Sequence, residues 1–464
     1  MDDGSVIGLE SAERRTRRSL VVAPAVAMVV AMTLVVGVPV SASAATSPDL
    51  NAAVHYLATT TGANGVVNGT SLAHDGFWEA FDQFADFGLT IDGAFALAAT
   101  GTDNATLRKV VSFLRDGKTD PSGNSVDDWT GIGTAFASGG SIGKEALLAE
   151  VTGYDPRAFG GHDLIAALVN VICTKTDVAN GCGGSGNYAY STATFSQAFG
   201  VIAALRAGDT TGAAAPVAFL EGLQNASGAW PSFIPASGDS DVDSTAIAAM
   251  ALALLPNDPT ASAAVTHALA WIATKQSPTG GFPGVAVDST NSSGLAIQAL
   301  TLAGAKYAAQ IAKATAFLAA RQNADGGFDV AASGQPGSDA RASAQAVGGI
   351  VGTSYGTLFD VLPPVTASTT TTTSAPASTT TTTVGTSTRG ESSPTNSAST
   401  STTLVTEPAT AVGPASLPAT GADAGRLLAW VVTLLVLGAG ATVVGRKRTS
   451  SARASTDTRR RGGR

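Results

Sequence analysis

The chain has 464 residues, with 35 acidic against 27 basic residues and a formal charge of −8. The basic residues gather near both ends, so that residues 45–365 hold 27 Asp and Glu against 13 Lys and Arg, a formal charge of −14. A surface of that charge repels nucleic acid and anionic lipid, which excludes both as expected partners.

The N-terminus has the order of an export signal. Basic residues at 14–18 precede an apolar run over 20–40, and Ala42-Ser43-Ala44 fits an A-x-A cleavage site. We expect a signal peptide over 1–44, with an uncleaved membrane anchor as the alternative because the apolar run is long. Residues 16–20 loosely resemble a twin-arginine signal, so Sec and twin-arginine export both stay open.

Between 45 and 190 the helical pattern is irregular. Segments 52–60, 105–115 and 163–174 are predicted to be amphipathic helices of an outer layer. Segments 92–101 and 131–140 are predicted to be helices of an inner layer, because they are small or apolar nearly all round.

Cysteine and histidine usage points to a disulfide rather than to a metal. Cys173 and Cys182 are the only cysteines, and in an exported protein a disulfide between them is expected. The four histidines lack zinc-ligand spacing, so no metal site is predicted.

A repeated pattern then dominates the chain. Three segments read aromatic-aliphatic-x3-Gln-x3-Gly-x-aromatic, with glutamines at Gln224, Gln276 and Gln322. Each glutamine is expected at the end of an outer helix, where it can bond the glycine turn while the last aromatic residue packs beside it.

A second pattern alternates with the first. Gln197, Met250, Gln298 and Gln345 each precede an alanine inside an apolar helical run, such as 244–255 and 292–304. A helix without a polar face must be covered on all sides, which predicts apolar helices inside amphipathic ones. Six helices of each kind would close a ring, and an open superhelical stack of helix pairs is the alternative.

These residues resemble the QW motif of the terpenoid cyclase and protein prenyltransferase superfamily. The resemblance is specific over about 190–355 and only suggestive over 50–190. It implies an all-α fold, an (α/α)6 toroid, for residues 45–365.

In a closed toroid the N-termini of the inner helices would surround a central cavity, where free backbone amides favour polar or anionic groups. The pattern places a set of polar residues at that rim. The predicted ligand-binding residues are Tyr188, Tyr190, Gln197, Asp241, Asp243, Asp288, Asn291, Gln298, Asp339 and Gln345.

Asp241-Val242-Asp243-Ser244 resembles the DxDD motif of class II terpene cyclases. The resemblance implies that Asp243 is a general acid that protonates an alkene or epoxide. Ser244 replaces the fourth acid, and Asp and Ser are also ordinary helix N-caps, which is the alternative interpretation. The Asp/Cys/His zinc set of the protein prenyltransferases has no counterpart in this chain.

Residues 344–347 and 352–355 resemble the closing helix and tail of the cobalamin carriers, and 292–300 resembles their inner-helix repeat. The resemblance implies cobalamin as a possible ligand, and no other cofactor is predicted. The C-terminal β domain with which those carriers clamp the corrin has no counterpart here.

The C-terminus predicts a cell-surface address. Residues 366–416 are rich in Thr, Ser and Pro and are expected to form an extended linker. Leu417-Pro418-Ala419-Thr420-Gly421, an apolar stretch over 427–444 and the basic residues 446–448 follow. In that order they resemble the LPxTG sorting signal of Gram-positive bacteria.

The sorting signal implies sortase and peptidoglycan as partners, a cell-wall location and a transmembrane helix that contacts the membrane only before sorting. An ordinary membrane anchor is the alternative. No nucleophile–base set, phosphate loop or metal cluster is visible, which favours a binding or adhesion module without chemistry. A secreted enzyme on the same scaffold, either cyclase-like or glycan-cleaving, is the competing hypothesis.

Overall fold

We describe the protein from a computed structural model. The residues it describes are 47–61, 69–81, 83–284, 287–331 and 337–362. The predicted signal peptide, the Thr/Ser/Pro-rich linker and the sorting signal with its transmembrane helix all lie outside these residues. Across the described ranges, no helix is both long enough and apolar enough to span a bilayer.

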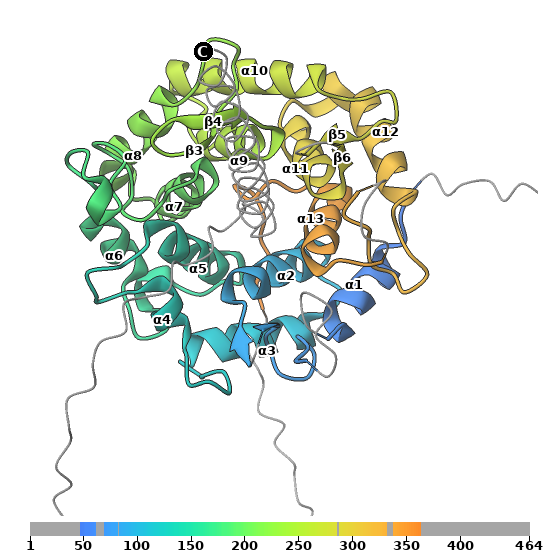
Figure 1. Ribbon diagram of the computed structural model, residues 1–464, viewed down its shortest axis with the longest axis horizontal. Coiled ribbons are helices and arrows are strands. Elements are labelled where there is room, and N and C mark those ends of the chain that lie inside the picture. Colours follow the sequence, from blue (N-terminus) through green and yellow to red (C-terminus); the bar gives the residue numbers. More distant parts are fainter. Residues whose placement is uncertain (1–46, 62–68, 82, 285–286, 332–336, 363–464) are drawn as a thin grey trace, which may run out of the picture. The chain divides into compact units, whose positions relative to one another are not determined.

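Two layers of helices make up the described part of the chain (Figure 1). The inner helices are α2 (Phe87–Thr100), α5 (Gly139–Val151), α7 (Thr194–Arg206), α9 (Val242–Leu252), α11 (Thr290–Thr301) and α13 (Ala340–Val351). The outer helices are α1 (Leu50–Thr59), α3 (Asn104–Arg115), the short α4 (Val126–Thr130), α6 (Leu164–Asn170), α8 (Thr210–Gly222), α10 (Pro259–Thr274) and α12 (Ala308–Ala319). The short 3₁₀ turns are η1 (Pro156–Ala158), η2 (Val178–Asn180) and η3 (Gly304–Tyr307).

The inner layer closes on itself. Each inner helix packs against the next one along the chain, and α13 packs against α2. The outer helix α1 contacts both α13 and α2, so it covers the seam where the ring closes. The prediction of an α/α toroid is confirmed, and the open superhelical stack is wrong.

The glutamine of each repeat bonds as the sequence predicts. Its Nε2 donates to the glycine carbonyl of the following turn, at 2.9 Å for Gln224, 2.9 Å for Gln276 and 3.0 Å for Gln322. The same Nε2 donates to a backbone carbonyl at the next outer helix, at 2.9, 2.7 and 2.8 Å respectively. Each glutamine therefore links one outer helix to the next.

The last of these links also closes the ring. Gln322 donates to the carbonyl of Asp49, the N-cap of α1, and accepts from the Asp49 amide at 2.7 Å. Gly326 has φ +91°, and a Cβ there would lie 2.2 Å from the carbonyl oxygen of Ala52. A side chain at this position would hold the two ends of the ring apart.

Strand hairpins lead from outer into inner helices. They pair β1 (Glu79–Phe81) with β2 (Phe84–Ala85), β3 (Pro231–Phe233) with β4 (Ser237–Ser240), and β5 (Phe282–Pro283) with β6 (Asp288–Ser289). Isolated bridges between Ala193 and Phe233 and between Ser289 and Ala331 join neighbouring segments of this kind. The entries to the inner helices therefore gather at one end of the toroid, which we call the N-terminal rim.

One predicted inner helix is misplaced. Segment 131–140 is mostly turn, and the inner helix α5 begins only at Gly139. Lys144, Glu145 and Glu150 lie on α5, and their charge hid its inner position from the sequence pattern. The structure also joins Cys173 and Cys182 by a disulfide in the turn between α6 and α7.

Candidate functional site

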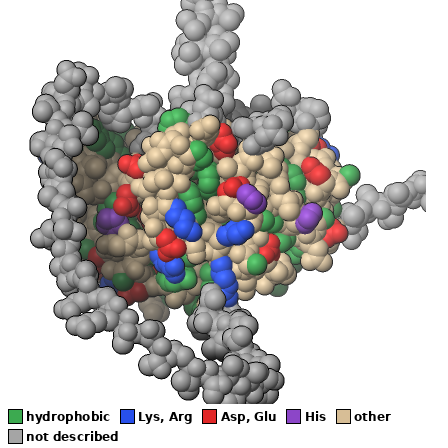
Figure 2. Space-filling view, turned by 90° about the horizontal axis from the view of Figure 1, so that it is seen from below, with side chains coloured by type: hydrophobic (Ala, Val, Ile, Leu, Met, Phe, Trp, Pro, Cys, Tyr) green, Lys and Arg blue, Asp and Glu red, His purple; other side chains and the backbone are tan. Residues whose placement is uncertain are grey.

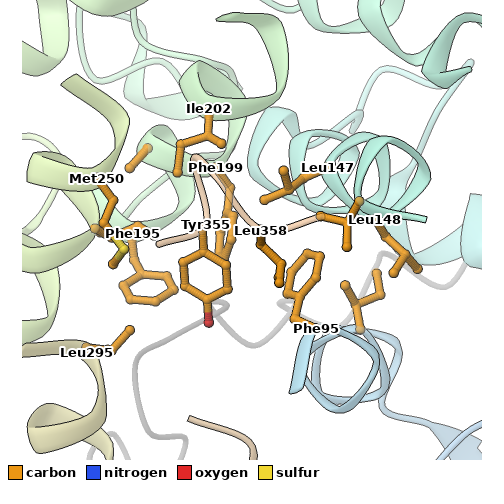
Figure 3. Close-up of a cluster of buried hydrophobic side chains, with 14 of the residues drawn as sticks. Phe95, Leu147, Leu148, Phe195, Phe199, Ile202, Met250, Leu295, Tyr355 and Leu358 are labelled. Atoms are coloured by element: carbon orange, nitrogen blue, oxygen red, sulfur yellow. The ribbon is translucent and has the colours of Figure 1, made fainter. Parts of the chain in front are cut away.

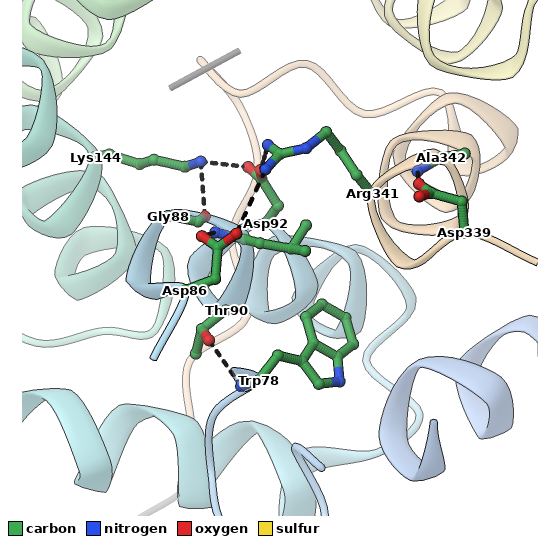
Figure 4. Close-up of polar contacts among 10 residues, drawn as sticks. Trp78, Asp86, Gly88, Thr90, Asp92, Lys144, Asp339, Arg341 and Ala342 are labelled. Carbon is green, nitrogen blue, oxygen red and sulfur yellow. Dashed lines mark hydrogen bonds and ion pairs between the residues drawn. The ribbon is translucent and has the colours of Figure 1, made fainter. Parts of the chain in front are cut away.

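Four charged side chains meet at the centre of the ring (Figure 4). The Lys144 ammonium on α5 lies 2.6 Å from the Asp92 carboxylate on α2. Arg341 on α13 lies 3.4 Å from Asp92 and 3.7 Å from Asp86, the N-cap of α2. We call these four residues the central charge cluster, and it connects three inner helices.

The central charge cluster is buried at one side and open at the other. The side chains of Lys144 and Asp92 are 1% and 3% exposed, whereas Arg341 and Asp86 are 29% and 25% exposed. Lys144 also donates to the carbonyl of Gly88 at 2.8 Å. Burial lowers the pKa of Lys144, and the attraction of Asp92 opposes that shift. The negative charges of the two aspartates balance the positive charges of the lysine and the arginine, and buried charges need such pairing.

Aromatic side chains gather in the middle of the ring (Figure 3), and the Lys144 ammonium lies 5.3 Å from the centroid of the Phe199 ring. The ring of Tyr355 lies 5.4 Å from those of Phe95 and Phe199, and both pairs meet edge to face. Phe195 meets Phe199 at 5.2 Å in the same way. Burial raises the pKa of Tyr355, and the charge of Asp92 raises it further.

Tyr355 belongs to a segment that follows the last helix. We call residues 352–362 the C-terminal strap. The side chains of Tyr355 and Leu358 are 4% and 3% exposed, and they fill the middle of the ring among side chains of α2, α5, α7 and α9. The centre of the toroid is therefore occupied by the chain's own residues.

The predicted rim aspartates lie at or beside the starts of inner helices. Asp241 caps α9 by accepting from the amide of Ser244, and Asp339 caps α13 by accepting from the amide of Ala342. Asp243 lies half-buried in the first turn of α9. Asp288 lies on β6 and accepts hydrogen bonds from the hydroxyls of Ser277 and Thr279.

The predicted asparagine and glutamine side chains differ in how many hydrogen bonds they make. Asn291 donates to Gln345 at 3.0 Å, joining α11 to α13. Gln298 is 3% exposed, and its Oε1 has no hydrogen-bond partner within the described ranges. Gln197, by contrast, makes four protein hydrogen bonds. It accepts from Asn187 and from the amide of Tyr188, and it donates to the carbonyls of Gly186 and Pro216.

The two predicted tyrosines have different surroundings. Tyr188 is buried against α5 and α7, because Gly139 and Gly200 leave room for its ring. Tyr190 has φ +57° and lies 6.1 Å from the ring of Phe136, which is 51% exposed. Tyr188 thus belongs to the core, whereas Tyr190 lies beside an exposed aromatic ring.

Asp92, Lys144 and Arg341 were not among the predicted site residues. The signal that could have found them is a charged residue inside a helix that is otherwise apolar on every face. Asp92 was placed at the start of its helix, but α2 begins at Phe87 and Asp92 lies inside it.

Two more acids are buried on α5. Burial raises the pKa of Glu145 to about 8, with a further contribution from Asp127. Asp127 lies 2.9 Å from His162. Burial also raises the pKa of Glu150 to about 8, although Arg206 lies 3.2 Å away and opposes the shift. Within the part of the chain that the structure describes, no group of three or more His, Cys, Asp or Glu could hold a metal ion.

Comparison with known proteins agrees with the fold. Residues 160–339 match the family model described as the prenyltransferase alpha-alpha toroid domain. This match runs from just before α6 to the N-cap of α13, so it includes the three repeats. The match covers 180 of the 464 residues and supports an α/α-toroid domain in this part of the chain.

Solved structures resemble the chain only remotely. The crystal structure of a protein from Actinoplanes is 18% identical to this chain, with a TM-score of 0.48. The match covers 65% of this chain and 98% of the Actinoplanes chain. The type II terpene cyclase MstE from Scytonema is 15% identical, with coverages of 65% and 96% and a TM-score of 0.45. A possible member of the GH105 family from Salmonella enterica is 12% identical, with coverages of 65% and 92% and a TM-score of 0.45. No curated protein matches the chain.

Proposed function

We propose that this protein is exported and anchored to peptidoglycan by sortase, and that it displays the toroid as a binding module without catalysis. The A-x-A site at 42–44 and the LPATG motif at 417–421 support the address. The linker over 366–416 would carry the toroid away from the membrane.

The occupied centre of the ring is the observation that carries the non-catalytic part of this proposal. Tyr355 and Leu358 fill the middle of the ring, and Asp92 already faces both Lys144 and Arg341. A general acid or base needs access to its substrate and a proton to exchange with it. Asp243 forms part of the first turn of α9, at a position that ordinary N-terminal turn residues also occupy.

The N-terminal rim is the surface best suited to a partner, because most of the negative charge lies there. Its described residues include 14 Asp and Glu against 4 Lys and Arg, a formal charge of −10. The six segments counted are 60–86, 116–138, 171–193, 223–241, 275–289 and 320–339.

Among the described residues, each segment of the rim also presents one large exposed hydrophobic side chain. These are Phe84, Phe136, Val178, Phe233, Val287 and Val330, with exposed fractions of 41, 51, 65, 42, 40 and 39%. These are single side chains and not one contiguous patch, so they add to the charge of the rim as apolar contacts that a partner on this face would cover. Together with the charge, they favour a partner that is basic and carries apolar side chains, such as a Lys-rich polypeptide.

The side of the toroid over α3 carries positively charged side chains, in contrast to the acidic N-terminal rim. Figure 2 shows Lys and Arg side chains gathered there, and α3 contributes Arg108, Lys109 and Arg115. Two of these residues are held locally. Lys109 donates to the carbonyl of Ala73, and Arg115 pairs with Asp116 at 2.7 Å. The rim is therefore the better candidate for a binding surface.

A titration with a synthetic peptide of alternating Lys and Phe, followed by fluorescence anisotropy, tests the rim. We expect binding that weakens with salt, because screening shortens the reach of surface charge. Phe136→Ser or Phe233→Ser should each weaken binding by about tenfold, the loss of roughly one buried apolar side chain. Val169→Ser on α6, a residue of similar exposure away from the rim, is the matched control.

Two results would replace this proposal. Turnover of a prenyl or polysaccharide substrate that is lost in Asp243→Asn would favour the enzyme hypothesis. A saturable change in cobalamin absorbance at micromolar protein would favour a corrin carrier. Equal binding of the Lys/Phe peptide by wild type and both rim variants would remove the rim as the binding surface.

A further inference from the structure

The C-terminal strap turns back across the end of the toroid opposite the N-terminal rim. Figure 1 shows it, in orange, running from α13 into the centre of the ring. The amide of Asp360 donates to the carbonyl of Val151 at 2.8 Å, and that of Leu362 to Thr152 at 3.3 Å. Both acceptors lie at the C-terminal end of α5.

One side chain of the ring holds the strap backbone. Nη1 of Arg206, the last residue of α7, donates to the carbonyls of Tyr355, Gly356 and Leu358 at 3.0, 3.1 and 2.8 Å. Glu150 lies 3.2 Å from Nε of the same guanidinium and keeps it in place. A guanidinium that donates to three carbonyls of one turn recognises a backbone shape, whatever side chains the turn carries.

The side chains of the strap alternate between the ring and solvent. Tyr355, Leu358 and Leu362 are 4%, 3% and 7% exposed, whereas Phe359 and Val361 are 64% and 50% exposed. The ring therefore accepts an aromatic residue and a leucine three positions later, with room for a turn between them. Gly356 fits this turn closely, because a Cβ there would lie 3.2 Å from the carbonyl of Met250.

The ring does not depend on the strap for its closure. Each inner helix contacts its neighbours, and the seam is joined by Gln322, Asp49, Gly326 and Ala52. None of these contacts involves residues 352–362. The strap lies in the ring as a bound peptide would, joined to it covalently only through the end of α13.

We propose that the C-terminal end of the ring is a peptide-binding site that recognises an aromatic-x-x-leucine turn, and that the strap occupies this site in cis and leaves it as a unit. The hydrophobic part of the site is the aromatic group of Phe95 and Phe199, and Arg206 is its polar part. This inference does not depend on wall anchoring or on the rim, so it can fail while the proposed function stands. If it holds, a strap that leaves would uncover the middle of the ring, and the non-catalytic part of the proposed function would then rest on Asp92 and its two ion pairs.

The test uses the full chain with Tyr355→Ala and Leu358→Ala combined, and a fluorescent synthetic peptide of residues 352–363. We expect this double variant to bind the peptide, and wild type to bind it at least about tenfold more weakly because its own strap competes. A peptide with alanine at both positions should not bind. Phe359→Ala with Val361→Ala, which alters only exposed strap residues, should behave as wild type.

Arg206→Lys adds a test of the polar part of the site. Placed in the double variant, it removes the planar group that donates to three carbonyls, and peptide affinity should fall by at least about tenfold. An unchanged affinity would remove Arg206 from the site. Failure of the double variant to bind the peptide would overturn the proposal as a whole.

Hydrogen exchange separates a releasable strap from an integral part of the core. In wild type, the amides of Asp360 and Leu362 should exchange through a local opening while those of α7 and α11 stay protected. The double variant should exchange these strap amides at least about tenfold faster with no change in α7 or α11. Exchange of the strap only together with the inner helices, in either protein, would show that it is part of the core and would overturn the proposal.

Discussion

The two halves of the toroid hold their helices together by different polar contacts. From α8 to α13, neutral glutamine side chains link each outer helix to the next through the same pair of carbonyl contacts. From α2 to α7, the polar contacts include buried charges, with Asp92 on Lys144 and Glu150 on Arg206. One ring geometry is therefore reached by two means, of which only the first repeats along the sequence.

The difference matters for stability. A neutral hydrogen bond contributes modestly and can be lost without leaving a charge behind. A buried ion pair contributes little net stability. Removal of one partner nevertheless leaves the other as a buried charge without compensation, which is strongly destabilising. Substitutions that break an ion pair in the charged half should therefore lower the free energy of unfolding more than substitutions that break a glutamine contact in the repeated half, although both halves have the same fold.

The largest expected effect comes from Lys144→Met. The variant leaves Asp92 buried, with Arg341 at 3.4 Å as its remaining ion-pair partner. We expect the free energy of unfolding to fall by about 3–5 kcal/mol in urea denaturation. Lys144→Met combined with Asp92→Leu should recover most of that loss, because both charges are then gone. A double variant as unstable as the single one would show that packing, and not the charge, is responsible.

The next effect is a dependence of stability on pH that arises from Glu145. Its pKa is about 8 in the folded protein against 4.5 for an ordinary glutamate. Between these values the unfolded chain releases the proton and the folded chain keeps it. The stability contribution is therefore complete below pH 4.5 and is lost as pH rises to about 8, at roughly 1.4 kcal/mol per pH unit.

Glu145→Gln should remove this slope and raise stability at pH 8 by about 2–4 kcal/mol. Thermal unfolding measured from pH 5 to pH 8 checks both outcomes. Glu150→Gln is the matched comparison. The pKa of Glu150 is also raised to about 8, but Arg206 would lose its partner, so the gain should be smaller. Parallel curves for wild type and Glu145→Gln would contradict the prediction.

The repeated half could be predicted from sequence because its bonds join residues at fixed spacing. Gln224 reaches Gly228, and Gln276 reaches Gly280, four positions along in each case. The same pattern correctly implied an outer helix before each glutamine and an inner helix after each aromatic. Closure of the ring followed from the number of helices.

The central charge cluster could not be predicted in this way. Arg341 and Asp92 are 249 positions apart, so only the closed ring brings them together. Lys144, Glu145 and Glu150 made α5 look unlike an inner helix, and its position was misjudged for that reason. The place of the strap inside the ring was not predicted either, because residues 352–355 showed only a resemblance to the tail of the cobalamin carriers and Leu358 follows the last repeat.

A smaller effect separates the seam from the regular repeats. Gln322 makes three hydrogen bonds, two of them across the seam to Asp49, whereas Gln276 makes two within the repeated half. Either change to alanine should lower the free energy of unfolding by about 1–3 kcal/mol. Only Gln322→Ala should also speed hydrogen exchange in α1, because it releases the cap residue Asp49. Faster exchange of α1 in both variants would show that the seam is not a distinct unit.

The smallest expected effect comes from Gln298, whose Oε1 is buried on α11 with no partner among the described residues. Gln298→Leu keeps the size of the side chain and removes the unsatisfied oxygen, so stability should stay the same or rise by about 1 kcal/mol. Gln345→Leu is the control, because it breaks the bond from Asn291 and should lower stability by about 1 kcal/mol. Loss of stability in Gln298→Leu as large as in Gln345→Leu would mean that the Gln298 amide is bonded in solution. It would then belong with the hydrogen-bonded glutamines of the repeats.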